Sequence, residues 1–342
     1  MTVIICSMSD HLINIRGPAD SPADGTEPAT LADSDLRGSL YRRMLLIRRF
    51  EERVYRLFLD GEIPGTLHQY QGQEAVAVGV CDVLTRDDWI TSTHRPHGHA
   101  LAKGVSTRAA MAELYGRRTG CCAGKGGSMH LGDPDVGMLP AIAIVGGGNT
   151  VVTGLGLAMK LRRRRQVAVC FFGEGATNEG AFHEGINFAA VERLPVVLVC
   201  ENNLYGASTS YSRVALVPDV AERAKAYGVP ARIVDGMDVL AVRAAARDAV
   251  AAARAGDGPT LLECKTYRFT GHSRSDARGY RTREEEARWA ARDPLLVLGA
   301  SLDEATLGHL EAEVKTELDD AVEFARNSPF PDPGDATADV YA

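Results

Sequence analysis

Four apolar runs in the second half of the chain constrain its fold more than any other feature of the sequence. They are typical of strands and cover residues 166–172, 195–201, 231–236 and 259–267. Stretches with a helical pattern lie between them, at 178–192, 218–227 and 238–255. Continuous apolar runs, rather than alternating ones, indicate strands that are covered on both faces. The pattern therefore predicts an α/β fold, with a mostly parallel sheet flanked by helices on both faces.

A long amphipathic helix is expected to open the folded part of the chain. It runs from Asp35 to the stop at Asp60-Gly61. Its apolar residues recur at helical spacing and are Leu36, Leu40, Met44, Ile47, Val54, Leu57 and Phe58. Residues 1–34 mix Asp, Pro, Ser, Ala and Gly without a sustained period, which predicts a disordered N-terminal tail. We therefore expect residues 35–342 to form a single α/β domain that ends in helices.

The charge balance limits the classes of partner. The chain has 45 acidic and 38 basic residues and a net charge of −7, which argues against nucleic acid and anionic membranes. No apolar run approaches the roughly 20 residues of a membrane-spanning helix, and the N-terminus lacks the features of a signal peptide. A cytoplasmic protein is expected.

The cysteines do not form a metal-binding pattern. There are seven, an odd number, and Cys170, Cys200 and Cys264 lie inside apolar runs, where a reduced core thiol is expected. Cys121 and Cys122 are adjacent, and no CxxC pair occurs. A structural zinc site is therefore not expected.

Two loops that follow apolar runs carry the polar residues of greatest interest. The first, GEGATNEG at 173–180, lies between a predicted strand and a predicted helix, where glycines let backbone amides approach a phosphate. It does not match the dinucleotide pattern GxGxxG, because Asn178 occupies the third glycine position. The second loop begins with Glu201-Asn202-Asn203.

Glu174 and Asn203 each come just after the end of a predicted strand. A carboxylate and an amide oxygen are ligands of the kind that Mg²⁺ prefers, and a diphosphate and water could complete its octahedron. An isolated Asn-Asn pair is more often only a turn. Here one helix and one strand separate the two loops, and this combination favours the metal site.

The two loops together resemble the thiamine-diphosphate fingerprint, in which Asn-Asn follows a Gly-acid-Gly turn after one helix and one strand. Residues from about 40 to 295 resemble the alpha subunit of 2-oxo acid dehydrogenases, a family that includes pyruvate, branched-chain and acetoin dehydrogenases. The matching motifs are THRPHGH (93–99), GKGGSMH (124–130), IVGGG (144–148), FFGEGATNEGAFHEG (171–185), ENNLYGAST (201–209) and YRFTGHSRSDARGYRTREE (267–285). The resemblance implies a thiamine-diphosphate-binding fold, with thiamine diphosphate and Mg²⁺ as cofactors.

The resemblance also implies which residues bind the metal and the diphosphate. Glu174, Asn203 and the backbone carbonyl of Tyr205 become the Mg²⁺ ligands. Many relatives have Asp at the position of Glu174, but branched-chain members have Glu. Gly175 and Ala176 would offer their amides to the diphosphate.

Four further residues match positions that contact the cofactor in this family. Arg95 would hold the diphosphate by charge-assisted hydrogen bonds, and His94 stands where pyruvate-type members often have Tyr. Ala143 and Val145 match positions at the aminopyrimidine, where the bulky Val helps to bend the cofactor. Many relatives have Gly in place of Ala143, and Asn149-Thr150 departs from the sequence that usually follows IVGGG.

Two histidines are catalytic candidates. His272 matches the active-site histidine that contacts the diphosphate and assists acyl transfer to the lipoyl arm, a role that suits a group titrating near neutral pH. His68 matches a residue near the cofactor. Taken alone, a loop histidine is more often a solvated bystander. A rival interpretation of His94, His97 and His99 is a transition-metal site, which the lack of a nearby carboxylate in the sequence disfavours.

The implied partner is a beta subunit. We find no match here for the glutamate that activates the cofactor, and in this family that residue belongs to the beta chain. The resemblance therefore implies a heterotetramer of two alpha and two beta chains, with the active site at their interface and a lipoyl-bearing transacylase as the acyl acceptor. Neither nucleic acid nor a membrane is expected as a partner.

Several functions remain open at this point. The leading one is oxidative decarboxylation of a pyruvate-like 2-oxo acid with acyl transfer to a lipoyl group. Acetoin cleavage and transfer of a two-carbon unit to an acyl-carrier protein are alternatives that use the same cofactor. A nicotinamide-dependent Rossmann oxidoreductase is disfavoured by the missing third glycine. A non-catalytic scaffold is disfavoured by the presence of Glu174, Asn203 and His272.

Overall fold

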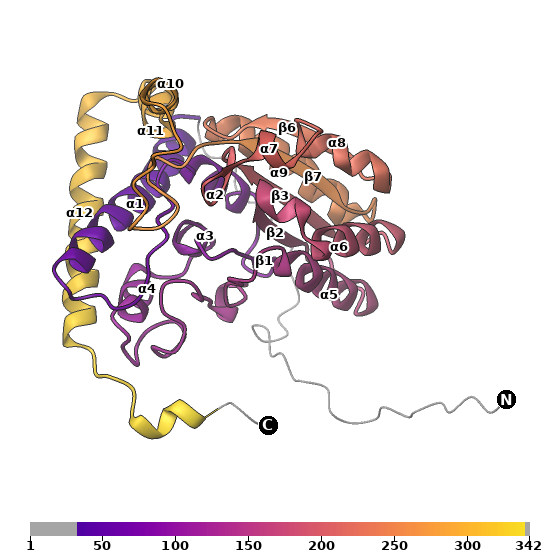
Figure 1. The fold of residues 1–342 in the computed structure, drawn as a ribbon. Coiled ribbons are helices and arrows are strands. Elements are labelled where there is room, and N and C mark those ends of the chain that lie inside the picture. The colour runs from indigo at the N-terminus through magenta and orange to yellow at the C-terminus, as the bar shows by residue number, and fades with distance from the viewer. Residues whose placement is uncertain (1–32, 339–342) are drawn as a thin grey trace.

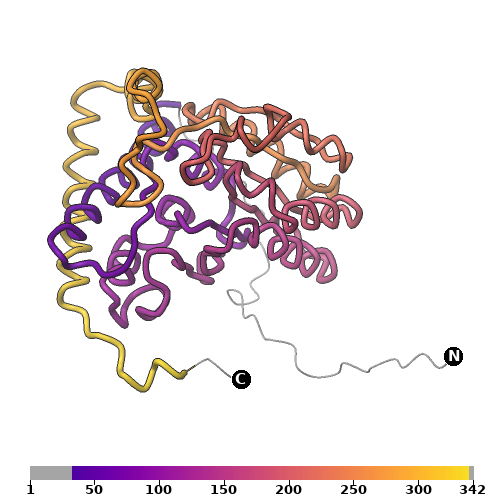
Figure 2. The backbone as a smooth tube through the Cα atoms, in the orientation of Figure 1, coloured from indigo at the N-terminus to yellow at the C-terminus, as the bar shows by residue number. Residues whose placement is uncertain are grey.

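The computed structural model describes residues 33–338, so the predicted N-terminal tail lies outside the described residues except for Asp33 and Ser34. Both belong to the first helix, α1 (Asp33–Leu59), which begins slightly earlier than the predicted start at Asp35. Helices surround a central sheet, and a long C-terminal helix runs along one side (Figures 1 and 2). The division of the chain into a tail and one domain stays a prediction.

Five parallel strands form the central sheet, in the order β1-β2-β3-β7-β6. Their bounds are β1 (Trp89–Thr91), β2 (Ala168–Gly173), β3 (Val196–Asn202), β6 (Ala231–Asp235) and β7 (Thr260–Lys265). Four of them coincide with the four apolar runs. The predicted α/β fold with a mostly parallel sheet is confirmed.

The strands alternate their side chains between two separate cores. Along β2, Val169 and Phe171 enter the core shared with α1 and α9 (Val239–Ala255), whereas Ala168, Cys170 and Phe172 enter the core on the opposite face. This follows from the two-residue period of a strand. Because both faces are apolar, the runs are continuous rather than alternating. The described cysteines are all free, and those predicted for the core are buried.

Helices cover the two faces of the sheet as the crossover pattern predicts. α5 (Gly147–Leu161), α6 (Gly180–Val191) and α8 (Val220–Ala224) lie on one face, while α9 lies on the other with α2 (Glu74–Cys81) behind it. The predicted helix at 218–227 is divided, because α8 continues as a short 3-10 helix, Lys225–Tyr227.

The edge strands differ from the predicted pattern. β1 was not predicted, because three residues are too few to show a period. β6 has apolar residues in its sequence, but Ala231, Arg232 and Ile233 are exposed. Coverage on both faces therefore applies to the three central strands and not to this edge.

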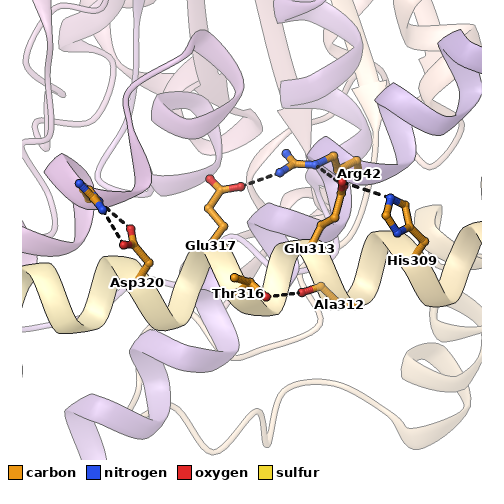
Figure 3. Close-up of a pocket in the computed structure, with 8 residues that line it drawn as sticks. Arg42, His309, Ala312, Glu313, Thr316, Glu317 and Asp320 are labelled. Carbon is orange, nitrogen blue, oxygen red and sulfur yellow. Dashed lines mark hydrogen bonds and ion pairs between the residues drawn. The ribbon is translucent and has the colours of Figure 1, made fainter.

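The C-terminal helix α12 (Glu304–Asn327) packs against α1 and against α4 (Thr107–Leu114). Its inward stripe of Leu310, Val314, Leu318 and Val322 is buried at helical spacing. Ion pairs line its flank, including Arg42–Glu317 at 2.7 Å and Arg108–Asp320 at 2.5 Å (Figure 3). Exposed pairs of this kind contribute about 0–1 kcal/mol each, so the buried stripe dominates the attachment.

Shorter elements complete the fold. The helices are α3 (His97–Lys103), α7 (Tyr211–Val214), α10 (Arg283–Ala290) and α11 (Pro294–Gly299), the 3-10 helices are Pro134–Val136, Glu174–Asn178 and Pro333–Thr337, and the antiparallel pair is β4 (Tyr205–Gly206) with β5 (Thr209–Ser210). In the part of the chain that the structure describes, no helix combines the length and the apolar character needed to cross a membrane.

The close packing of α5 and α6 gives a test of the fold. A Cβ atom on Gly185 would lie 2.6 Å from the carbonyl oxygen of Asn149, which is rigid backbone. We expect Gly185→Ala to lower the free energy of unfolding by about 1–3 kcal/mol through overpacking. Gly308→Ala in α12 is the control, because its Cβ meets nothing within 4 Å. Urea denaturation should show it to be neutral or slightly stabilising, and equal stability of the two variants would contradict this packing.

Candidate functional site

The candidate site lies where β2 and β3 end. Glu174 follows β2 directly, and Asn203 follows β3. The backbone N–H of Asn203 donates a hydrogen bond of 3.1 Å to Glu174 Oε2, so the two residues that supply the predicted metal ligands are in direct contact. Glu174 is buried, and this burial raises the pKa of its carboxyl group. A cation at this point would favour the charged carboxylate.

A cavity of about 310 Å³ opens at this edge of the sheet, a size in the range of small-molecule sites. Most of the predicted site residues line it, namely His94, Arg95, Ala143, Val145, Glu174, Gly175, Ala176, Asn203, Tyr205 and His272. They come from five separate segments of the chain. The remaining candidate, His68, does not line the cavity, but its ring packs against two histidines that do.

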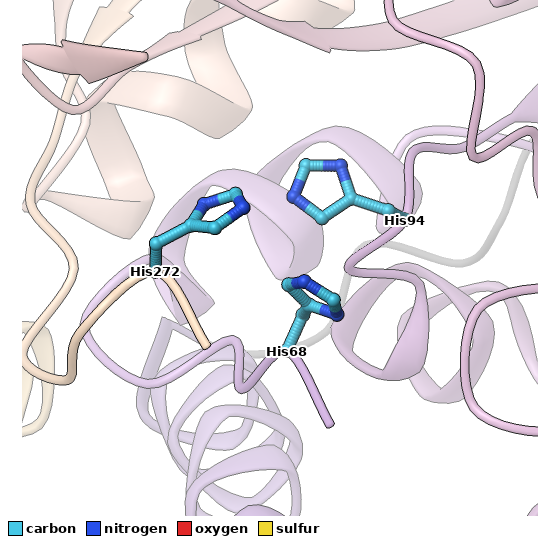
Figure 4. Close-up of side chains that lie close together, drawn as sticks. All are labelled: His68, His94 and His272. Atoms are coloured by element: carbon cyan, nitrogen blue, oxygen red, sulfur yellow. The ribbon is translucent and has the colours of Figure 1, made fainter. Parts of the chain in front are cut away.

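His68, His94 and His272 form a compact cluster (Figure 4). The ring of His68 lies 4.9 Å from that of His94 and 5.1 Å from that of His272, measured between centroids. Nδ1 of His68 and Nε2 of His94 are buried without a hydrogen-bond partner among the described residues. One ligand atom from each ring lies within 4.8 Å of the others. His68 and His94 therefore present unpartnered nitrogen atoms to the small region that the His272 ring also borders.

The surroundings of the cluster keep these imidazoles neutral. Burial, followed by the charge of Arg95, lowers the pKa of His94 to about 2 and that of His68 to about 4. Burial and Arg95 also lower the pKa of His272 to about 4. At neutral pH each ring can thus accept a proton or donate one N–H, but none carries a stable charge.

Arg95 holds the loop of His272 in place. Its Nη2 donates 3.0 Å to the backbone carbonyl of His272, and its Nη1 donates to the carbonyl of Gln69. Burial lowers the pKa of Arg95 to about 9. The predicted diphosphate-binding residue does line the cavity, but two of its donors already join segments that are distant in sequence.

Arg268 is a cavity residue that the sequence analysis missed. It is 1% exposed, and it donates from Nε to Asn203 Oδ1 at 3.1 Å and from Nη2 to the carbonyl of Ala207 at 2.9 Å. Its Nη1 is buried and has no partner among the described residues. The only sequence signal was its place just after the last strand, within the YRFTGH motif. A buried guanidinium with a free donor is suited to an anionic ligand.

His97 and His99 do not join His94 in a metal site. His97 lies between the carboxylate of Glu51 at 3.1 Å and the hydroxyl of Ser128 at 3.0 Å. His99 contacts Ser92 Oγ at 2.7 Å and Glu201 Oε1 at 3.1 Å. These two rings are buried and fully hydrogen-bonded, so in the described part of the chain the HxxHxH segment contributes only His94 to a cluster of possible ligands.

Comparisons with known proteins give consistent matches. The family model described as "Dehydrogenase E1 component" matches residues 42–334. The alpha subunit of acetoin:2,6-dichlorophenolindophenol oxidoreductase from Bacillus subtilis is 48% identical over 88% of this chain and 92% of its own length. The chloroplastic pyruvate dehydrogenase E1 component subunit alpha-3 of Arabidopsis thaliana is 44% identical over 89% of this chain and 74% of its length. The pyruvate dehydrogenase E1 component subunit alpha of Rhizobium meliloti is 41% identical over 93% of each chain.

The neutral histidine cluster predicts a dependence of stability on pH. In the unfolded chain His94 takes up its proton near pH 6.5, but in the folded chain only near pH 2. Its contribution to stability is therefore present in full above pH 6.5 and is lost progressively as the pH falls below that value. We expect His94→Gln to lose less stability than the unmodified chain between pH 7 and pH 5, measured by urea denaturation.

His309→Gln is the matched control, because His309 is an exposed histidine on α12, outside the cluster. It should retain the pH dependence of the unmodified chain. If His94→Gln shows the same pH dependence as the unmodified chain, burial does not hold this ring neutral.

Proposed function

The chain belongs to the dehydrogenase E1 component family, and we propose that it is the alpha subunit of a thiamine-diphosphate-dependent 2-oxo acid dehydrogenase that acts with a beta subunit. The proposed reaction is oxidative decarboxylation of a pyruvate-like 2-oxo acid, with transfer of the acyl group to the lipoyl group of a transacylase. The observation that carries the proposal is the convergence of Glu174, Asn203 and the free Nη1 of Arg268 on one cavity.

The residues of the cavity fit a magnesium diphosphate group. Glu174, Asn203 and the carbonyl of Tyr205 would bind Mg²⁺ through oxygen atoms, as a hard cation requires. Gly175 approaches Gly206 so closely that a Cβ on Gly175 would lie 3.3 Å from the Cα of Gly206. Glycine at this position leaves the loop backbone free to approach the diphosphate.

Positive charge and backbone amides would hold the diphosphate. The free Nη1 of Arg268 offers a charge-assisted donor, and Arg95 adds a second guanidinium. The amides of Gly175 and Ala176 would donate to the same group. Ala143 and Val145 also line the cavity but belong to a different segment of the chain. We place the aminopyrimidine next to these two residues. When bound, thiamine diphosphate supplies the nucleophilic carbon and the electron sink for cleavage of the substrate.

The histidine cluster would manage protons near the reacting atoms. His272 and His94 line the cavity, and His68 packs against both rings. A neutral imidazole can accept a proton at one nitrogen or donate one from the other. We assign His272 to acyl transfer toward the lipoyl arm, with His68 supporting its orientation. The diphosphate, once bound, would raise the pKa values of these rings, because its negative charge favours the imidazolium form.

Exposed apolar residues beside the cavity support the need for a second chain. Ile144 is 77% exposed and Val145 is 53% exposed, although both line the cavity. We propose that the beta subunit covers this side and supplies the activating glutamate, in a heterotetramer of two alpha and two beta chains. We also propose that the protein is cytoplasmic and that neither a membrane nor nucleic acid is its partner.

Acetoin is the alternative substrate. The Bacillus subtilis relative named for acetoin shares 48% of aligned residues, and the Arabidopsis relative named for pyruvate shares 44%. The two values are close, so they favour acetoin only slightly. Purified alpha–beta complex assayed with pyruvate and with acetoin, each with 2,6-dichlorophenolindophenol as electron acceptor, will decide between them.

The metal site predicts the effect of removing Asn203. We expect Asn203→Ala to weaken binding of thiamine diphosphate with Mg²⁺ at least about tenfold, which corresponds to ~1.4 kcal/mol, because an oxygen ligand is lost. Isothermal calorimetry on the alpha–beta complex measures the affinity. Asn187→Ala, on the exposed face of α6, is the control and should bind normally. Unchanged affinity in Asn203→Ala would remove this residue from the metal site.

The assignment of His272 predicts a difference between two assays. His272 lies in a partly exposed loop, so we expect His272→Ala to fold and to assemble with the beta chain. Lipoyl acylation should fall about 10²- to 10⁴-fold, as is usual for a lost acid–base group, while oxidation by an artificial acceptor falls less. Equal losses in both assays would place His272 in cofactor binding or in the earlier steps.

A further inference from the structure

A buried carboxylate organises a loop that lies outside the site described above. Glu113, in α4, is 0% exposed. Its two oxygens accept hydrogen bonds of 2.7–3.0 Å from four backbone amides, those of Cys122, Gly124, Gly126 and Gly127. A carboxylate has about four acceptor positions, so these donors satisfy it. Residues 119–130, called here the cysteine loop, are therefore wrapped around one side chain.

The cysteine loop carries two adjacent thiols. The sulfur atoms of Cys121 and Cys122 lie within 4.8 Å of each other, and both residues are partly exposed. Glu113 lies equally near, but its hydrogen bonding is complete, so it is a poor third ligand for a metal ion. Cys122 Sγ also lies 3.3 Å from the carbonyl of His130. The loop thus presents a dithiol rather than a metal site.

The two thiols are not equivalent. The hydrogen bond between them raises the pKa of Cys121 and lowers that of Cys122. The lowered pKa makes Cys122 the more readily ionised of the two thiols, and this identifies it as the candidate nucleophile. By contrast, burial raises the pKa of Cys81, Cys170, Cys200 and Cys264, all of which are enclosed in the cores. Among the described cysteines, Cys122 is the one that is both partly exposed and lowered in pKa.

We propose that Cys121 and Cys122 form a thiol–disulfide exchange site, in which Cys122 attacks a small-molecule disulfide and Cys121 resolves the product. In the first step the Cys122 thiolate attacks one sulfur of the disulfide RSSR, forming Cys122–S–S–R and releasing one RS⁻. In the second step Cys121, after loss of its proton, attacks the sulfur of Cys122 and releases the second RS⁻. The two protein thiols are oxidised to one disulfide, and RSSR is reduced to two RSH.

The spacing of adjacent residues makes this disulfide reversible. Consecutive Cα atoms are about 3.8 Å apart, whereas disulfide-bonded cysteines usually lie roughly 4.4–6.8 Å apart. A bond between neighbours is therefore strained, and a strained disulfide is more easily reduced. The oxidised form would return to the dithiol when the thiol concentration rises.

Oxidation would also loosen the cysteine loop. The backbone at Cys121–Cys122 must rotate to close the ring, and the Cys122 amide is one of the four donors to Glu113 at 2.8 Å. The same loop contains Ser128, whose hydroxyl contacts His97 at 3.0 Å. His97 in turn contacts Glu51, which accepts from the amide of Tyr70. A buried chain of hydrogen bonds thus joins the loop to the segment that carries His68.

The experiment treats the folded full-length chain with oxidised glutathione and measures the mass of each tryptic peptide. Cys6 lies outside the described residues, so it is replaced by Ser in every sample. We expect the peptide with Cys121 and Cys122 to lose the mass of two hydrogen atoms, and dithiothreitol to reverse the change. Cys121→Ser should instead keep one glutathionyl group on Cys122. Cys122→Ser should remain unmodified, and the four core cysteines serve as internal controls.

Three outcomes would overturn the proposal. A stable glutathionyl adduct on the pair with both cysteines present would show that Cys121 does not resolve it. If Cys122→Ser is modified at the same rate as the chain with both cysteines, Cys122 is not the attacking thiol. If the folded chain is not modified at all, there is no exchange site here. Hydrogen exchange gives a second readout, because the amides of residues 122–127 should exchange faster after oxidation. Unchanged exchange would refute the predicted loss of contact with Glu113. None of these results depends on the proposed function.

Discussion

The parallel pairing of β2 with β3 is the constraint on which the rest of the site depends. Its register places Gly173, the last residue of β2, opposite Glu201, the last residue but one of β3, so Glu174 and Asn203 leave the sheet close together. The register is fixed because alternate residues of both strands enter two different cores. A shift of one residue would turn each set of side chains toward the opposite core, where it would not fit its neighbours. Core packing therefore determines the distance between the two candidate ligands.

Buried arginines attach the outer segments to this framework. Arg95 bridges the backbone of Gln69 and His272 and so unites two of the three clustered histidines. Arg48 pairs with Glu74 and Asp293, and its guanidinium also lies over the ring of Phe269. A buried guanidinium makes several directional hydrogen bonds at once, which one apolar contact cannot do. The histidine cluster is thus positioned by charge and hydrogen bonding, whereas the two candidate metal ligands are positioned by the sheet.

The difference between these two kinds of positioning explains what could be predicted from the sequence. The central strands β2, β3 and β7, the nearby helices and the positions of Glu174 and Asn203 followed from local apolar patterns and strand ends. β1 was too short to show such a pattern, and Arg268 gave no sign that it would be buried. The four amides around Glu113 depend on the conformation of the cysteine loop, which residue types alone do not specify. Contacts between distant segments need the three-dimensional structure.

The cavity contains a buried carboxylate and a buried guanidinium, and a ligand that carries both positive and negative charge can pair with both. Glu174 is a buried carboxylate whose pKa is raised by its surroundings, so it needs a cation. Arg268 has a buried, unpartnered Nη1, so it needs an anion. Asn203 lies between the two side chains and makes a hydrogen bond to each. A free phosphate would leave the carboxylate unpaired, and a bare metal ion would leave the guanidinium unpaired. A metal ion held by a diphosphate would neutralise both groups at once, which is the physical argument for the ligand proposed above.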